Sequence, residues 1–456
     1  MNKSFSPEAW IYSAKVLYGE NDRRVHGDPE NLIHNQLRDA IEKIIPNYSN
    51  CKVVNISFAS DYEVMSDDKM QFNLATLLDE LCAQYPIIIV ACVGNYDEDL
   101  TNYPDYLLDS SNKVKIANPS SSALALSIGS VYRTTTMDNE LDLPSPFTRI
   151  GPGFRGMIKP DLVEYGGKTH NEGVITLNPD WVTEGRLFRN MPGTSFSTPR
   201  VANHLVKILN HYPTFSPNLV TALLLSSATI PNEKPGVLAK IKPCDSDEKH
   251  MKVYNIYGYG KPNIEKALYS SSNRVIFYKD DVIKLNFVRL FPLTLPTEFV
   301  TEAGNRAISI SLSFNPPVNK NRASYLGVVM EVHLFKNAST QEIKNAYGEI
   351  KIDNTPELPD AEPLVPKKIK NLEIKLKPGA NIRKRGVHQK GIVNFIRKPQ
   401  IDIENPLTLV VICRSRGWVK EDYEQPYGIV VTIEHSKEID LYNELRNKNV
   451  QRARIR

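Results

Sequence analysis

Apolar and polar positions in the first 270 residues follow two alternating patterns. Runs that are apolar at nearly every position predict buried strands, and they lie at 10–17, 52–60, 86–95 and 123–131. Between them, apolar residues recur at helical spacing and predict helices over 32–45, 73–85, 198–209 and 218–228. Strands that are apolar on both faces and alternate with such helices are typical of a parallel sheet covered by helices on both sides. This part of the chain is therefore predicted to be α/β.

The pattern changes after about residue 270. Short strands of alternating polarity, broken by Pro, Gly and Asn, replace the helical period; one of them is RAISISLSFNPP at 306–317. Such strands predict an antiparallel β-sandwich, and we place the domains at 1–272 and 273–456. The Pro-rich, charged segment 353–371 predicts an exposed loop. The basic tail 446–456 is expected to be a solvated chain end, not a nucleic-acid site.

Charge, apolar runs and cysteine spacing limit the classes of partner that the sequence supports. The chain has 456 residues, with 56 basic and 52 acidic side chains and a formal charge of +4. This balance gives no electrostatic reason for a nucleic-acid or membrane partner. No apolar run approaches the roughly 18 residues of a spanning helix, and the first residues lack the apolar core of a signal peptide. The five cysteines are scattered and show no metal-ligand spacing. We expect a cytoplasmic protein without a metal site.

A serine at the start of a predicted helix is the first candidate for chemistry. Ser195 lies in the stretch MPGTSFSTPR, residues 191–200. Gly193 allows close approach of the backbone, and the free N–H groups and dipole of the helix end favour negative charge near the serine hydroxyl. The same residue can also serve only as an N-cap, which is a common role of serine. The three residues Gly193, Thr194 and Ser195 alone do not distinguish a nucleophile from an N-cap.

Six motifs, in the same order, resemble those of the subtilisin-like serine proteases (subtilases, peptidase family S8). The stretch Gly193–Pro199 resembles the nucleophile motif Gly-Thr-Ser-x-Ala/Ser-x-Pro. The other five similar segments are Ser13–Leu17, Val53–Ala59, Ile89–Asn95, Lys159–Val163 and Tyr257–Gly260. Together they cover residues 10 to about 270. The resemblance implies a subtilisin-like fold and a serine endopeptidase that acts on polypeptides.

The resemblance also implies roles for single residues. Ser195 would be the nucleophile that becomes acylated, and the Asn95 amide and the Ser195 N–H would stabilise the oxyanion. An asparagine after a glycine at a strand end is otherwise a common turn former, so the role of Asn95 rests on the resemblance. Two walls of the substrate pocket would be formed by Ser57, Phe58 and Ala59 and by Val93 and Gly94. Ala59 stands where the family has glycine, and its methyl group predicts a narrower entrance.

The segments that carry the family's catalytic Asp and His have no match. In the family both precede the strand that residues 14–17 resemble, and only about a dozen residues precede it here, too few for two strands and a helix. His26 is followed by glycine, but the rest of the family's His-Gly-Thr motif is missing, and Asp161 belongs to a structural motif. We therefore expect an N-terminally incomplete, truncated subtilisin-like domain, with little peptidase activity from residues 1–456 alone.

Three explanations stay open. The chain is the C-terminal part of a longer protease, which we favour because the nucleophile, oxyanion and pocket segments are intact. Alternatively, it is a non-catalytic pseudo-protease that binds extended peptides in the same cleft, or the base arrives from another polypeptide. By family analogy, an AAA-type ATPase is a partner. The family often binds calcium, but no acidic cluster marks a site, and we expect no cofactor.

Overall fold

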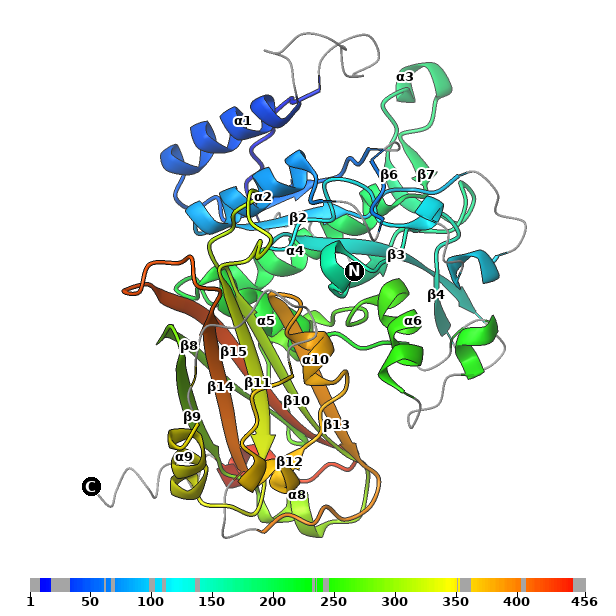
Figure 1. Ribbon diagram of the computed structural model, residues 1–456. Helices are drawn as coiled ribbons and strands as arrows, with labels where there is room; N and C mark the ends of the chain where they lie inside the picture. Colours follow the sequence, from blue (N-terminus) through cyan, green and yellow to red (C-terminus); the bar gives the residue numbers. More distant parts are fainter. Residues whose placement is uncertain are drawn as a thin grey trace.

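The computed structural model separates a mixed α/β sheet from two antiparallel sheets (Figure 1). It describes residues 9–17, 33–60, 63–66, 70–97, 103–108, 112–135, 140–231, 234, 236–240, 246–350, 352, 362–402 and 407–445. The predicted fold class, a helix-covered parallel sheet followed by an antiparallel β region, is confirmed. Among the described residues no helix is long and apolar enough to cross a membrane.

Within the described residues, the α/β sheet has five strands, of which four run parallel. They are β1 (Val53–Ile56), β2 (Ile88–Cys92), β3 (Leu126–Thr135), β4 (Glu140–Pro144) and β5 (Leu162–Tyr165). Strands β1, β2, β3 and β5 are joined by parallel pairs, and β4 returns antiparallel to β3. Because β1 pairs only with β2 among the described strands, it forms one edge of the sheet.

The near-continuous apolar sequence of β2 follows from burial on both faces. Ile89 and Ala91 belong to the same core cluster as the first two helices, whereas Ile88 and Val90 pack with the helices on the other side. The helices of this half are α1 (Ile33–Asn47), α2 (Asn73–Gln84), α3 (Trp181–Glu184), α4 (Thr194–His211), α5 (Pro217–Ser227), α6 (Asp247–Tyr257) and α7 (Ile264–Leu268). A separate two-stranded sheet pairs β6 (Val174–Leu177) with β7 (Phe188–Met191).

The β-sandwich consists of two four-stranded antiparallel sheets, ordered β13-β10-β15-β8 and β12-β11-β14-β9. The strands are β8 (Arg274–Lys284), β9 (Phe287–Leu293), β10 (Arg306–Phe314), β11 (Val328–Phe335), β12 (Glu373–Ile374), β13 (His388–Phe395), β14 (Leu407–Ser415) and β15 (Glu424–His435). Three short helices flank them: α8 (Thr297–Thr301), α9 (Thr340–Gly348) and α10 (Ala380–Arg383).

Helix α5 joins the two halves. Ser216 caps it by accepting the Leu219 N–H, and Pro217 occupies its first turn. At its other end the buried Lys390 ammonium of β13 donates to the carbonyls of Leu225 and Ser226 at 3.0 and 3.2 Å. A sandwich lysine thus satisfies helix-end carbonyls of the α/β half.

Some predicted elements differ from the structure. The predicted strand at 10–17 is wrong: the segment pairs with no described strand, and Trp10 and Ile11 are exposed. The helix expected at 198–209 begins earlier, at Thr194. In the predicted loop 353–371, residues 367–371 belong to a 3₁₀ helix (Lys367–Leu372). Residues 353–361, His26 and the tail 446–456 lie outside the described residues.

Candidate active site

The motif residues meet where two parallel strands end and one helix begins. Strand β1 leads into Ser57, β2 leads into Gly94 and Asn95, and α4 starts immediately before Ser195. The carboxyl ends of parallel strands share one edge of a sheet, which is the usual ligand site of such folds. The structure therefore brings together residues that are up to 138 positions apart in sequence.

Ser195 is half-buried in the first turn of α4. Its hydroxyl donates a hydrogen bond of 2.8 Å to the Ser57 carbonyl. Its backbone N–H belongs to the first helical turn, where no carbonyl of the same helix can accept it. The nucleophile candidate is thus accessible, and its N–H lies at the positive end of the helix dipole.

Asn95 is held in one orientation by Thr194. Its side-chain oxygen Oδ1 accepts hydrogen bonds from the Thr194 N–H at 3.0 Å and from the Thr194 hydroxyl at 2.9 Å. The amide nitrogen Nδ2 therefore points away from Thr194; it would lie 3.6 Å from a β-carbon built on Gly193. Asn95 itself is exposed. An exposed N–H donor thus lies beside the start of α4.

Backbone geometry at Gly193 permits this approach. Its φ is +154°, a conformation that L side chains rarely adopt, and its N–H donates to the Gly166 carbonyl at 2.9 Å. The hydroxyls of Ser197 and Thr198 both donate to the Thr194 carbonyl. The polar residues of the serine motif therefore have distinct tasks: some shape the helix start, and Thr194 orients Asn95.

The predicted pocket walls lie side by side. Ser57, Phe58 and Ala59 follow β1 and are half-buried, whereas Val93 and Gly94 follow β2 and are buried. Gly94 has a φ of +91°, and a β-carbon there would lie 3.3 Å from the Ala59 methyl group. The extra methyl therefore lies directly against the opposite wall.

No described histidine or carboxylate hydrogen-bonds to the Ser195 hydroxyl. On the same helix, His204 bonds instead to the Glu164 carboxylate at 3.2 Å. It lies nine residues after Ser195, about 13 Å along the axis. Asp161 is buried, pairs with Lys159 at 2.6 Å and accepts the Ser127 N–H. It therefore holds β5 to β3 and does not contact the serine.

Beside the edge strand β1 lies a cavity of about 590 Å³. Its walls are mostly apolar and come from residues 9–16, α1, β1 and the outer side of α4. Among the described strands none pairs with the outer edge of β1, which ends at Ile56, next to the Ser57 whose carbonyl accepts the Ser195 hydroxyl.

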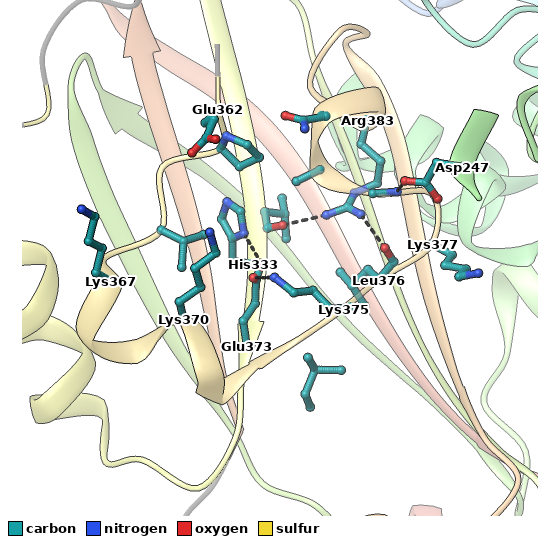
Figure 2. Close-up of a pocket in the computed structure, with 17 residues that line it drawn as sticks. Asp247, His333, Glu362, Lys367, Lys370, Glu373, Lys375, Leu376, Lys377 and Arg383 are labelled. Carbon is teal, nitrogen blue, oxygen red and sulfur yellow. Dashed lines mark hydrogen bonds and ion pairs between the residues drawn. The ribbon is translucent and has the colours of Figure 1, made fainter. Parts of the chain in front are cut away.

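A second cavity, of about 470 Å³, lies on the sandwich and contains none of the motif residues. In Figure 2, His333 of β11 points at Glu373, and the Lys375 ammonium approaches the same carboxylate. The His333 ring bonds to Glu373 at 2.7 Å through Nδ1 and to Glu331 at 3.4 Å through Nε2. Burial opposes the charge of His333, but hydrogen bonds to the two glutamates raise its pKa. This cluster is a structural ion network.

A family model decides the assignment. The model described as the subtilase family matches residues 6–260, more than half of the chain. The chain belongs to the subtilase family. The resemblance to subtilisin-like serine proteases inferred from the motifs is thereby confirmed.

Other proteins are also similar to this subtilase. The protein y4bN of Sinorhizobium fredii (strain NBRC 101917 / NGR234) is 29% identical over 448 residues, 91% of this chain and 99% of the relative. Among solved structures, the prenylagaramide maturation protease PagA is 19% identical, covering 54% of this chain and 70% of its own, with a TM-score of 0.34. A lanthipeptide protease is 20% identical, covering 56% and 68%, with a TM-score of 0.36.

The sequence interpretation missed two contacts in the site. It did not identify Thr194 as the residue that holds Asn95, although Thr194 lies inside the serine motif. It also did not anticipate that the Ser57 carbonyl accepts the Ser195 hydroxyl. Both contacts join segments about 100 or more positions apart, which no local pattern reveals.

Among the described residues, no group of three or more His, Cys, Asp or Glu is placed to hold a metal ion.

Proposed function

We propose that this subtilase is a serine endopeptidase that hydrolyses peptide bonds through an acyl-enzyme on Ser195. The supporting observation is the fixed Asn95 amide beside a serine whose N–H lies in the first turn of α4. Donors fixed before the reaction stabilise an oxyanion without reorganising. Residues 57–59 and 93–94 would hold the substrate side chain that precedes the scissile bond.

In this mechanism the Ser195 oxygen attacks the peptide carbonyl and gives its proton to a base. The Asn95 Nδ2–H and the Ser195 N–H donate to the oxygen that becomes negative. The tetrahedral intermediate then collapses, the base returns the proton to the departing amine, and an ester on Ser195 remains. Water hydrolyses this ester by the same two proton transfers.

The base is supplied by a group outside the described surroundings of Ser195. In subtilisin, loss of the catalytic histidine slows turnover by about a million-fold. We therefore propose that residues 1–456 alone have little peptidase activity.

The experiment that tests this proposal uses a fluorophosphonate probe on the intact product of the native locus. Covalent labelling at Ser195, located by mass spectrometry, is expected for that product and not for its Ser195→Ala variant. Ser197→Ala is the matched control, because Ser197 is buried and bonds only within α4. Absence of labelling in a folded locus product would refute the proposed catalysis.

A second candidate function is peptide binding without catalysis. Two observations favour it: the Ser195 hydroxyl bonds to a backbone carbonyl, and the edge of β1 is unpaired among the described strands. A free edge can accept an extended peptide by strand addition.

The cytoplasmic location and the AAA-type ATPase partner remain predictions from the sequence. Co-purification of the tagged native protein with such an ATPase would test the partner.

A further inference from the structure

The hairpin that leads into the serine motif carries a concentration of exposed apolar side chains. We define the apolar arm as residues 174–191: strands β6 and β7 with helix α3 at the tip between them. In Figure 1 the arm extends away from the α/β sheet. Six of the 17 large exposed hydrophobic side chains of the described chain lie on it, between 52% and 74% exposed: Ile175, Leu177, Trp181, Val182, Leu187 and Phe188.

The outer face of the hairpin is largely apolar, with Asn190 as its polar member, whereas the half-buried face mixes Val174 and Met191 with polar residues. Leu177 pairs with Phe188, and both are exposed on the same face as Ile175. Thr176 and Arg189, on the opposite face, are half-buried. A two-stranded sheet normally buries its apolar face and exposes its polar one. A contiguous exposed apolar face of this kind is typical of an interaction site.

A polar network gives the tip of the arm a defined shape. The buried Asn178 amide donates to the Glu184 carboxylate at 2.7 Å and to the Arg186 carbonyl at 3.0 Å. Its oxygen accepts the Asp180 N–H at 3.1 Å, and Arg189 approaches the Asp180 carboxylate at 3.5 Å. Because these contacts fix the backbone, the outward direction of the apolar side chains is part of the fold.

The base of the arm is attached to the candidate active site. Only three residues separate Met191, the end of β7, from Ser195. A β-carbon on Gly173 would come within 2.7 Å of the Met191 backbone, so the start and end of the arm are in direct contact. The apolar arm therefore starts and ends within a few residues of the serine at which a scissile carbonyl would lie.

Resting on the proposed function, we infer that the apolar arm binds an extended, apolar segment of the polypeptide substrate next to the scissile bond. Within the described part of the chain, β6 and β7 pair only with each other, so their outer edges are available to an added strand. Each strand has four residues, which matches an extended segment of about four to six residues. The substrate class is unfolded polypeptide with exposed apolar stretches.

The charges of the arm favour a polypeptide over a lipid surface. Its tip and strands carry two acidic residues, Asp180 and Glu184, and two basic residues, Arg186 and Arg189. Segments that lie on anionic membranes usually carry an excess of Lys and Arg on their polar face. The balanced arm lacks that excess, whereas its apolar face and free edges suit an extended peptide.

The test measures binding in a Ser195→Ala background, so that cleavage plays no part. The probe is fluorescein-labelled α-lactalbumin, reduced and carboxymethylated to keep it unfolded, and binding is followed by anisotropy. The test variant is Leu177→Thr/Phe188→Thr, which removes the apolar pair and keeps residues that favour strands. We expect it to bind the probe at least tenfold more weakly than the parent.

The matched control is Phe287→Thr/Ile396→Thr on the sandwich. Phe287 is 56% exposed and Phe188 is 57% exposed, so the two doubles remove similar apolar surface. The control is expected to bind like the parent, and circular dichroism checks that both variants fold.

A second measurement uses tryptophan fluorescence. With Trp10 and Trp418 replaced by Phe, Trp181 is the one tryptophan left of three, and its emission should shift to shorter wavelength when the probe binds.

Each other outcome overturns the inference in a distinct way. Equal binding by the arm double and the parent shows that the arm does not hold polypeptide. A dimeric parent that becomes monomeric in the arm double, by sedimentation velocity, assigns the arm to a second copy. Arm-dependent binding to phosphatidylcholine–phosphatidylserine vesicles, with none to unfolded α-lactalbumin, assigns it to lipid. A different result, the absence of Ser195 labelling in the locus product, would refute only the proposed catalysis. The binding measurements use the Ser195→Ala background and do not depend on catalysis.

Discussion

At the scale of single residues, the candidate site depends on Asn95 being held by its neighbour. Thr194 offers two donors to one amide oxygen, and this arrangement decides which end of the Asn95 side chain faces the helix start. If the amide nitrogen faced Thr194 instead, it would meet the Thr194 backbone N–H, which can only donate. The orientation of the proposed oxyanion donor is therefore a consequence of hydrogen bonding that is complete before substrate arrives.

Substitutions at these two positions should have graded effects. Asn95→Ala removes the donor and is expected to slow fluorophosphonate labelling of the locus product by about 10²–10³-fold. Thr194→Val removes one of two bonds to Oδ1 and keeps the N–H, so a loss of about fivefold is expected. Labelling rates are measured against Ser197→Ala. An unchanged rate in Asn95→Ala would contradict the role of its amide.

The buried His333 gives stability a dependence on pH. Burial opposes ionisation of Glu373, but hydrogen bonds from His333 and Lys375 lower its pKa from 4.5 to about 2. Burial opposes the charge of His333, but its hydrogen bonds to Glu331 and Glu373 raise its pKa above 6.5. The Glu373 contribution is therefore present above pH 4.5 and lost as pH falls towards 2. The His333 contribution is complete below pH 6.5 and lost as pH rises through the raised value.

We expect His333→Gln to lower the free energy of unfolding by about 3 kcal/mol between pH 5 and 6.5, because it removes the buried charge between Glu331 and Glu373 and leaves them only Arg414 and Lys375 as cationic partners. The difference from the wild type should shrink at higher pH, where His333 of the folded wild type loses its proton. Urea unfolding at pH 5.5, 7 and 9 measures it. His170→Gln, at an exposed position, is the control. A difference that is constant across these pH values would show that folding does not shift the pKa of His333 and would contradict its ion pairs with the two glutamates.

At the scale of elements, the sequence predicted a helix or strand correctly where the segment is apolar because the folded protein buries it. The strand 86–95 was identified because β2 is buried on both faces, and α5 because its apolar residues face both the sheet and the sandwich. Segment 10–17 has the same apolar composition but forms no strand, since a strand needs a partner edge. Composition cannot supply that information.

The apolar arm was missed for a related reason. Strands β6 and β7 have only four residues each, VITL and FRNM, and their apolar positions do not alternate regularly, so no strand pattern marks them in the sequence. Only the structure shows that Ile175, Leu177 and Phe188 face outward. In the site, the resemblance named the individual residues, whereas the Thr194–Asn95 and Ser195–Ser57 contacts required the fold.

At the scale of the whole molecule, the sandwich and the α/β half meet at a close backbone crossing, in addition to the contacts of Lys390 with the end of α5. Gly428 of β15 lies against the start of α5, and a β-carbon there would come within 2.3 Å of the Leu219 backbone. Nearby, the Asn218 amide donates to the Pro426 carbonyl at 3.3 Å. Because α5 also packs beneath the sheet whose strands end at the site, this crossing couples the two halves.

Gly428→Ala should therefore destabilise the entire chain. Its methyl group cannot be accommodated by rotating a side chain, because the neighbouring atoms are backbone, so β15 and α5 must separate. We expect a loss of about 3 kcal/mol or more in the free energy of unfolding, measured in urea. Gly348→Ala is the control, since a β-carbon there meets nothing within 4 Å. If Gly428→Ala unfolds in two separated transitions with the α/β half unaffected, the two halves are independent, and the crossing does not couple them.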